Sequence, residues 1–542
     1  MNPLHQLEIV ILLLMVVLAL TTVARKLGIP YPILLVIGGL VLGLVPGLPV
    51  VHLDPDLVFL VFLPPILWAA AYFTSWRDFR ANLRPITLLA VGLVLVTTAA
   101  VAGVAHAVLP GLEWAGAIAL GAIVSPPDAV SATAVGRQLH LLRRGLTILE
   151  GESLVNDATA LVLYRAALAA AVSGSLELKD TLLDFILAAI VGIAVGFAVG
   201  LVIRWALRLT GDSFSEIAIT LLAPYIAWVL AEQAHASGVL ACVAGGLYLR
   251  RHFSAIVAPA TRIQARAVWD LLVFVLNGLI FILIGLQLGP LRDAIPSGEL
   301  NSLTLKGALV AVTVIVVRLI WVPIAAWVPR FLSPSLRARD PMPPWSNLFI
   351  LGWTGMRGIV SLAAALALPL TLAAGTPFPF RAEIILITFM VILVTLVLQG
   401  LSLPLLIRAL DLGEDRSLEY EERHARERAA TAALARLEEV VAEDWPVPDH
   451  IEQLRVHYAR RRQRYANGGA PDSECTKEVA EAFRRLRHET LTAERFALIN
   501  LRNEGVINDE TLHRLEQELD VEALRFGLGE LRVSALQRSN QA

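Results

Sequence analysis

The sequence predicts an all-α, polytopic membrane protein with a charged helical tail. Of its 542 residues only 17% are charged, and the mean hydropathy of +0.67 is too high for an ordinary soluble enzyme. The apolar residues fall in runs about as long as a bilayer is thick. The net charge is only −2, but the charged residues are concentrated near the end of the chain. This change in composition predicts a boundary between a transmembrane domain, residues 1–410, and a cytosolic charged tail, residues 411–542.

About thirteen transmembrane helices account for the apolar runs. They are expected near residues 6–24, 31–45, 57–74, 86–109, 114–136, 145–173, 181–207, 215–234, 238–249, 268–289, 305–329, 347–373 and 382–408. The first run has almost no basic residues before it and no small-residue cleavage signal before Arg25. We therefore expect it to remain as a span instead of being cleaved as a signal peptide.

Alternate loops between these spans carry most of the arginines. The basic loop residues are Arg25 and Lys26; Arg77, Arg80 and Arg84; Arg137, Arg143 and Arg144; Arg204 and Arg208; Arg250, Arg251, Arg262 and Arg266; Arg330, Arg337 and Arg339. Because basic loops stay on the cytoplasmic side, this alternation predicts an inner-membrane protein with its N-terminus outside and its tail in the cytoplasm.

Charged residues inside the spans are the first functional candidates, since a charge in lipid is costly and needs a partner. The candidates are Asp128, Glu152, Asp157, Glu216, Arg318 and Arg357. Arg318 lies about half-way along its span, which favours a buried partner, such as a core acid or a helix end, over a position at the membrane surface.

The first motif is Ser125-Pro126-Pro127-Asp128, in the middle of an apolar run. Each proline lacks an N–H donor and crowds the preceding turn, so Pro126 and Pro127 are expected to break the helix and expose carbonyl oxygens. A broken helix beside Asp128 is typical of a cation site in a secondary transporter. The alternative is a kink that only shapes the helix bundle.

The second motif, Gly151–Asp157, places Glu152, Ser153, Asn156 and Asp157 on one broad helical face, because residues four apart share a side of a helix. A carboxyl group removed from water holds a proton near neutral pH and can release it when a cation arrives, so Asp157 is the candidate for exchange. Ser153 can add a hydroxyl oxygen, and Asn156 can orient Asp157 or hold the broken helix. A polar patch for helix packing is the alternative.

The third motif, Gly352–Ser361, surrounds Arg357 with glycines that weaken the helix and allow another backbone to approach. A guanidinium there needs a buried acid. Glu152 is the expected partner in a structural ion pair, and Asp128 is the alternative. The broken fifth and twelfth spans lie seven apart, which predicts inverted repeats, spans 1–6 and 8–13, whose broken helices cross at the membrane midplane.

These motifs resemble the monovalent cation:proton antiporter family, in the branch of the bacterial sodium/proton antiporters and the animal sodium/hydrogen exchangers. The likeness covers roughly residues 5–410 and rests on Phe62–Leu67, Ser125–Ala132, Gly151–Val162, Ser237–Ala241 and Gly355–Pro369. It implies a thirteen-helix fold in which a core domain moves against a dimerisation domain in an elevator-like cycle, and hence a homodimer.

The resemblance also implies roles for individual residues. Asp157 resembles the ion-binding aspartate and Asn156 its neighbouring asparagine, while Ser153 and Asp128 resemble further ligands of the transported Na+. An Asn-Asp pair is associated in the family with electroneutral one-for-one exchange. The chain departs from the family in two places: Pro127 replaces a frequent threonine, and the stretch 68–72 lacks an acid that many relatives carry.

The sequence thus predicts a transporter, not an enzyme, that exchanges H+ for Na+, with Li+ or K+ as alternatives and no cofactor. A cation channel is less favoured because the chain has one Asn-Asp site and no repeated pore element. A membrane hydrolase lacks a histidine or lysine base near Ser153 or Ser361. The tail has no nucleic-acid or nucleotide motif, and we expect either a regulatory domain or a solvated appendage.

Overall fold

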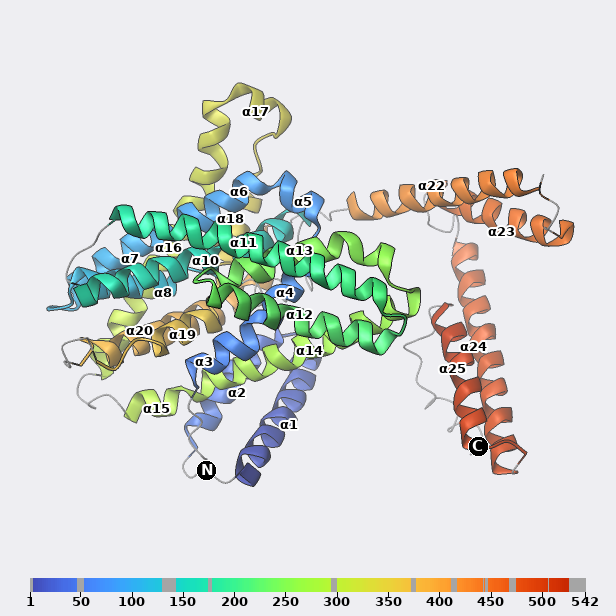
Figure 1. Cartoon of the computed structure of the whole chain (residues 1–542), viewed down its shortest axis with the longest axis horizontal. Coiled ribbons are helices and arrows are strands. Elements are labelled where there is room, and N and C mark those ends of the chain that lie inside the picture. Colours follow the sequence, from blue (N-terminus) through green and yellow to red (C-terminus); the bar gives the residue numbers. More distant parts are fainter. Residues whose placement is uncertain are drawn as a thin grey trace. The chain divides into compact units, whose positions relative to one another are not determined.

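A computed structural model describes residues 3–45, 53–128, 143–173, 178–293, 300–371, 377–410, 417–441, 443, 447–466, 474–504 and 506–525 (Figure 1). Its contacts divide the chain into two compact units, Met1–Asp415 and Arg416–Ala542. In the described residues of each unit, every named element of secondary structure is a helix.

The first unit is a bundle of long apolar helices. Among the described residues, nine helical stretches are long and apolar enough to cross a membrane, and the shorter helices Tyr31–Gly43 and Trp114–Val124 are also apolar. The prediction of an all-helical, multi-span membrane protein is therefore confirmed. The helices are α1 (Pro3–Leu27), α2 (Tyr31–Gly43), α3 (Pro55–Leu57), α4 (Leu63–Phe73), α5 (Trp76–Ala81), α6 (Leu83–Thr87), α7 (Val94–Val108), α8 (Trp114–Val124), α10 (Arg143–Ser173), α11 (Leu178–Leu209), α12 (Ser213–Gln233), α13 (Gly238–Ile256), α14 (Pro259–Leu286), α15 (Leu288–Asp293), α16 (Leu300–Leu332), α17 (Pro334–Arg339), α18 (Trp345–Trp353), α19 (Ile359–Leu366), α20 (Arg381–Val394) and α21 (Gly400–Ala409).

Small residues let several of these helices pack backbone to backbone. A Cβ added to Gly39 of α2 would lie 2.3 Å from the carbonyl oxygen of Ile282 in α14, and one on Gly196 of α11 would lie 2.1 Å from the carbonyl oxygen of Ala241 in α13. In a membrane the hydrophobic effect does not drive helices together, because lipid tails are themselves apolar. The close approach of the backbones instead stabilises the helix pairs through van der Waals contact. The pairs α2–α14 and α11–α13 are therefore closely packed.

Two spans are interrupted where the motifs predicted a break. Helix α8 ends at Val124, directly before Ser125 and the two prolines, and residues 354–358 separate α18 from α19. The backbone N–H of Asp128 donates to the carbonyl oxygen of Met356 at 2.7 Å, so the two breaks meet. The end of the predicted fifth span, residues 129–136, lies outside the described residues.

Asp340, in the loop after α17, joins three helices through arginines. It accepts from Arg84 of α6 at 2.9 Å, from Arg144 of α10 at 2.8 and 3.0 Å, and from Arg330 of α16 at 2.7 Å. The hydrogen bonds from Arg144, with the positive charges around it, hold the pKa of the Asp340 carboxyl below its usual value.

Replacing Asp340 with asparagine is expected to lower the thermal stability of the purified protein at neutral pH, by about 1 kcal/mol because the group is partly exposed. A carboxyl whose pKa is lowered on folding stabilises the fold above its unfolded pKa of about 3.9, and this contribution is lost as the pH falls through the lower folded pKa. The difference in Tm between Asp340→Asn and wild type should therefore be present at neutral pH and shrink in acid. Asp56→Asn, at an exposed acid of α3, is the control, and an equal effect of both variants would contradict the role of the cluster.

The second unit contains α22 (Ser417–Val440), α23 (Pro448–Ala466), α24 (Glu474–Asn503) and α25 (Asp509–Arg525). Helix α22 packs on α23, and α24 packs on α25. Ion pairs between Arg487 and Glu522 and between Arg495 and Asp520 join the second hairpin. The helical tail predicted from apolar residues spaced among charges is present in the described residues.

Candidate functional site

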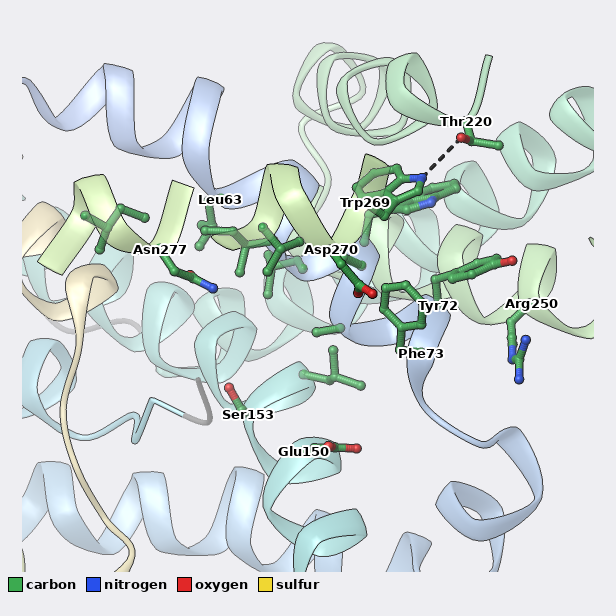
Figure 2. A pocket seen from close by; sticks show the side chains of 18 of the residues that line it. Leu63, Tyr72, Phe73, Glu150, Ser153, Thr220, Arg250, Trp269, Asp270 and Asn277 are labelled. Carbon is green, nitrogen blue, oxygen red and sulfur yellow. Dashed lines mark hydrogen bonds between the residues drawn. The ribbon is translucent and has the colours of Figure 1, made fainter. Parts of the chain in front are cut away.

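A cavity of about 620 Å³ lies within the helical bundle of the first unit and is lined by both acids and aromatic rings. Helix α10 supplies Ser153 and Glu150 to one side, and α14 supplies Asn277 and Asp270 to another, as Figure 2 shows. Trp269 of α14 also lines the cavity, and its indole N–H donates to the hydroxyl of Thr220 in α12 at 3.2 Å. The cavity thus lies between α10, α12 and α14.

Asp157, on α10, is buried at the cavity wall, with 6% of its surface exposed. Ser153 lies one turn before it and lines the same cavity, as the i,i+4 spacing predicted. Asp128, beside the break after α8, also lines the cavity and lies close enough to Asp157 for their charges to repel. Among the described residues, the Asp157 carboxyl has no hydrogen-bond donor and no cationic partner. The carboxyl groups of Asp128 and Asp157 and the hydroxyl of Ser153 therefore line the same cavity.

Asn156 holds the broken span in place. Its side-chain amide donates to the carbonyl oxygen of Pro127 at 3.0 Å, across the gap between α10 and the break. Its Oδ1 is buried without a hydrogen-bond partner in the described part of the chain. Pro127 has no side-chain hydroxyl, and its backbone oxygen accepts from the Asn156 amide.

Arg357 binds the carbonyl oxygens that the proline break leaves open. Its Nε donates to Val124 O at 2.9 Å, its Nη2 donates to Ser125 O at 3.1 Å, and its Nη1 donates to Gly355 O. The C-terminal end of a helix carries a partial negative charge, so a buried guanidinium is stabilised there. Arg357 is 1% exposed, so water does not compete for these hydrogen bonds.

The ion pair predicted between Glu152 and Arg357 is wrong. Glu152 instead pairs with Arg318 of α16, with Nη1–Oε1 and Nη2–Oε2 distances of 2.5 and 2.9 Å. Both side chains are almost fully buried, at 1% and 0% exposed. The expectation that Arg318 has a buried acidic partner is confirmed. Arg357 does not need the same carboxylate, because backbone carbonyls of the broken helix satisfy its donors.

Glycines around Arg357 make room for these contacts. A Cβ on Gly355 would lie 2.4 Å from Cδ of Arg318, and a Cβ on Gly358 would lie 2.7 Å from both Cβ and Cγ of Asp128. The backbone of the twelfth span thus touches the Asp128 side chain directly. The glycine-rich motif is explained by this approach, since the φ of Gly358 is −136°, which other residues can adopt.

Replacing Gly358 with alanine is expected to displace Asp128 and to reduce transport strongly, while costing about 1–3 kcal/mol of stability through overpacking. Transport by the variant in proteoliposomes, together with its Tm, measures both effects. Gly103→Ala is the control, because a Cβ at Gly103 of α7 would meet nothing within 4 Å. Normal transport by Gly358→Ala would mean that the position of Asp128 is unimportant.

Several polar residues that line the cavity were not predicted from the sequence, among them Tyr31, Glu150, Asp270 and Asn277. Asn277 is a lone amide in the apolar run VFVLNGLIF, and Glu150 directly precedes the second motif, so a search for polar residues in spans could have found both. Tyr31 begins α2, and only the fold brings it beside Asp128 and Asn277. Trp68 and Ala69, in the stretch that lacks the relatives' acid, also line the cavity.

The family model for the transmembrane sodium/hydrogen exchanger matches residues 11–409. The chain belongs to the sodium/hydrogen exchanger family. This exchanger is 35% identical over 526 residues to a Mycobacterium tuberculosis protein named as an uncharacterized Na(+)/H(+) exchanger, Rv2287, and the match covers 96% of each chain. It is 31% identical over 427 residues to the sodium, potassium, lithium and rubidium/H(+) antiporter of Bacillus pumilus, covering 77% of this chain and 63% of that protein.

The fold of the exchanger matches a solved antiporter structure. The sodium proton antiporter MjNhaP1 from Methanocaldococcus jannaschii aligns with a TM-score of 0.59 at 20% identity, covering 76% of this chain and all of that one. The exchanger is accordingly a multi-pass membrane antiporter of monovalent cations and protons, and not an enzyme.

Proposed function

We propose that the exchanger trades H+ for Na+ by alternating access, with Asp157 binding either a proton or the cation. One observation carries this assignment: of the acids at the centre of the bundle, Glu152 is neutralised by Arg318, whereas Asp157 has no cationic partner among the described residues. A buried carboxylate without a counter-charge is unstable in a membrane unless it holds a proton or a cation. Because both occupy the same oxygens, binding of one excludes the other.

The neighbouring residues have distinct roles in this proposal. Asp128 and Ser153 supply further oxygen ligands to the transported Na+, since a hard cation prefers carboxylate and hydroxyl oxygens. Asn156 positions the proline break by holding Pro127 O. The Glu152–Arg318 pair is structural, because the two charges neutralise each other and leave no carboxylate to bind an ion. The contacts of Arg357 are structural, because backbone carbonyl oxygens accept its hydrogen bonds.

Exchange is proposed to be electroneutral, one H+ for one Na+, since one unpaired acid binds one or the other and Asn156 adds no second charge. Li+ is an alternative cation. K+/H+ exchange is the alternative, favoured by the name of the Bacillus pumilus relative, which includes potassium, lithium and rubidium. The large cavity and the missing acid at residues 68–72 are consistent with a site that tolerates larger cations.

The architecture proposed for this cycle has thirteen spans, formed by inverted repeats with the broken fifth and twelfth spans crossing at the midplane. Residues 1–410 form the transporting domain, with its N-terminus outside, and residues 411–542 form a cytoplasmic tail. The exchanger works as a homodimer in the inner membrane, where the core domain moves against the dimerisation domain. The meeting of the two breaks at Asp128 and Met356 supports the crossing.

The substrate is tested with wild-type protein in proteoliposomes that contain a pH dye. A proton gradient is imposed, the membrane potential is clamped, and Na+, K+ or Li+ is added outside. Dye recovery with Na+ that does not change with the clamped potential is the expected result. Recovery with K+ alone would replace the proposed substrate, and a rate that follows the potential would overturn one-for-one exchange.

A further inference from the structure

A second, smaller cavity of about 260 Å³ lies where the ends of α11 and α13 meet. Its polar lining consists of Arg204 and Arg208 from α11, Thr210 just after it, and His252 from α13; its apolar lining is Leu207, Ala255 and Ile256. It shares no lining residue with the 620 Å³ cavity. The ion-exchange chemistry therefore does not account for it.

The charge of this small cavity favours an anion. No acidic side chain lines it, while two permanently charged guanidinium groups do. Arg204 donates through Nη1 to the hydroxyl of Tyr248 at 2.9 Å, which fixes its side chain, but its buried Nε has no hydrogen-bond partner in the described structure. Arg208 has no partner among the described residues. Arg204 thus holds a buried N–H donor in place without an acceptor, and Arg208 adds a second positive charge to the same cavity.

The imidazole of His252 is fixed beside these arginines. Its Nδ1 lies 3.0 Å from the backbone oxygen of Tyr248, and its ring lies 4.6 Å from the Tyr248 ring, centre to centre. Tyr248 therefore orients both Arg204 and His252. A cavity with several oriented nitrogen groups and no carboxylate matches the tetrahedral oxygens of a phosphate group.

The surroundings of the cavity are apolar and exposed. Leu201, Val202, Trp205 and Leu209 of α11 are 44%, 61%, 64% and 67% exposed, and α11 forms one of the membrane-span candidates. Such a surface suits contact with acyl chains, and Trp205 suits the boundary between lipid tails and headgroups. A phosphate group bound in this cavity would therefore have a hydrophobic surface directly beside it for the rest of its molecule.

We propose that Arg204, Arg208, His252 and Thr210 form a binding site for the phosphate of an anionic phospholipid whose acyl chains lie along α11. Free inorganic phosphate shares the same headgroup chemistry but cannot use the apolar face of α11. The site is located at an arginine-rich end of the bundle, as expected for basic residues that contact anionic lipid headgroups. A bound lipid would join α11 to α13 at the membrane surface.

The test titrates phosphatidylglycerol into the full-length protein in mixed detergent micelles and follows Tm. Wild type is expected to gain stability with a saturable lipid dependence. Arg208→Gln, which removes an exposed side chain without a hydrogen bond or ion pair among the described residues, should not impair folding and is expected to raise the half-saturating lipid fraction about fivefold. Arg204→Gln combined with Arg208→Gln should raise it further.

Arg251→Gln is the matched control, because Arg251 is an exposed neighbour of His252 that does not line the cavity. It removes the same charge and should leave the titration unchanged. The proposed site would be wrong if wild type and Arg208→Gln had the same half-saturating lipid fraction. It would also be wrong if Arg208→Gln and Arg251→Gln raised that fraction equally. The same stabilisation by inorganic phosphate, or by phosphatidylcholine, would overturn its assignment to an anionic phospholipid. Na+/H+ exchange by Arg208→Gln, measured after reconstitution into proteoliposomes, is expected to persist, which separates this proposal from the ion site.

Discussion

Replacing Arg318 with methionine is expected to lower the free energy of unfolding by about 3–5 kcal/mol, because Glu152 would remain as a buried carboxylate without its partner. The two side chains are among the most buried charged groups in the described structure. Restoring neutrality with the double variant Glu152→Gln/Arg318→Met should recover much of the loss, since a neutral amide costs far less to bury than a charge. Thermal or denaturant unfolding of the purified variants measures both effects.

Arg408→Met is the control for this prediction, because Arg408 is an exposed arginine near the end of α21. It should change stability by no more than about 0.5 kcal/mol. If Arg318→Met is as stable as Arg408→Met, or if the double variant is less stable than the single one, the ion pair does not have the structural role assigned to it.

Replacing Asp157 with asparagine is expected to reduce exchange of every cation to the level of protein-free liposomes, while leaving the fold intact. Asparagine has nearly the same shape, and the carboxyl makes no hydrogen bond among the described residues that the fold would lose. An amide cannot alternate between a proton and a cation, so the loss follows from chemistry and not from unfolding. The pH-dye assay measures exchange, and Tm measures the fold.

Glu216→Gln provides a matched comparison for Asp157→Asn. Glu216 of α12 is 5% exposed, nearly the same as the 6% of Asp157, but it does not line the 620 Å³ cavity. The two acids are therefore equally buried and differ in whether they line this cavity. Exchange should persist in Glu216→Gln. Persistent exchange in a folded Asp157→Asn would mean that another group carries the proton.

Local chemistry in the sequence was sufficient to predict a multi-span helical fold and the position of the breaks. Apolar run length predicted the multi-span fold, and the missing N–H groups of Pro126 and Pro127 predicted the end of α8. Spacing along one helix predicted that Ser153 and Asp157 share a wall of the cavity, because a helical turn fixes their separation.

Pairing between distant spans could not be predicted in the same way. Glu152 had two buried arginines as possible partners, and the sequence does not encode which of α16 and the twelfth span lies nearer. Arg357 also showed that a buried guanidinium can be satisfied by helix-end carbonyls without an acid. Tyr31 lies far from the other motifs in sequence and reaches Asp128 only through the packing of α2 on α14.

Competition between H+ and Na+ for Asp157 is the central claim, and the pH dependence of the apparent Na+ affinity tests it most directly. Initial rates are measured in wild-type proteoliposomes over a range of Na+ concentrations at several pH values. If both ions bind one carboxylate, the half-saturating Na+ concentration should rise about tenfold for each unit by which the pH falls, once the group is mostly protonated. The maximal rate should still be reached at high Na+. A half-saturating concentration that stays constant while only the maximal rate falls in acid would contradict a shared site.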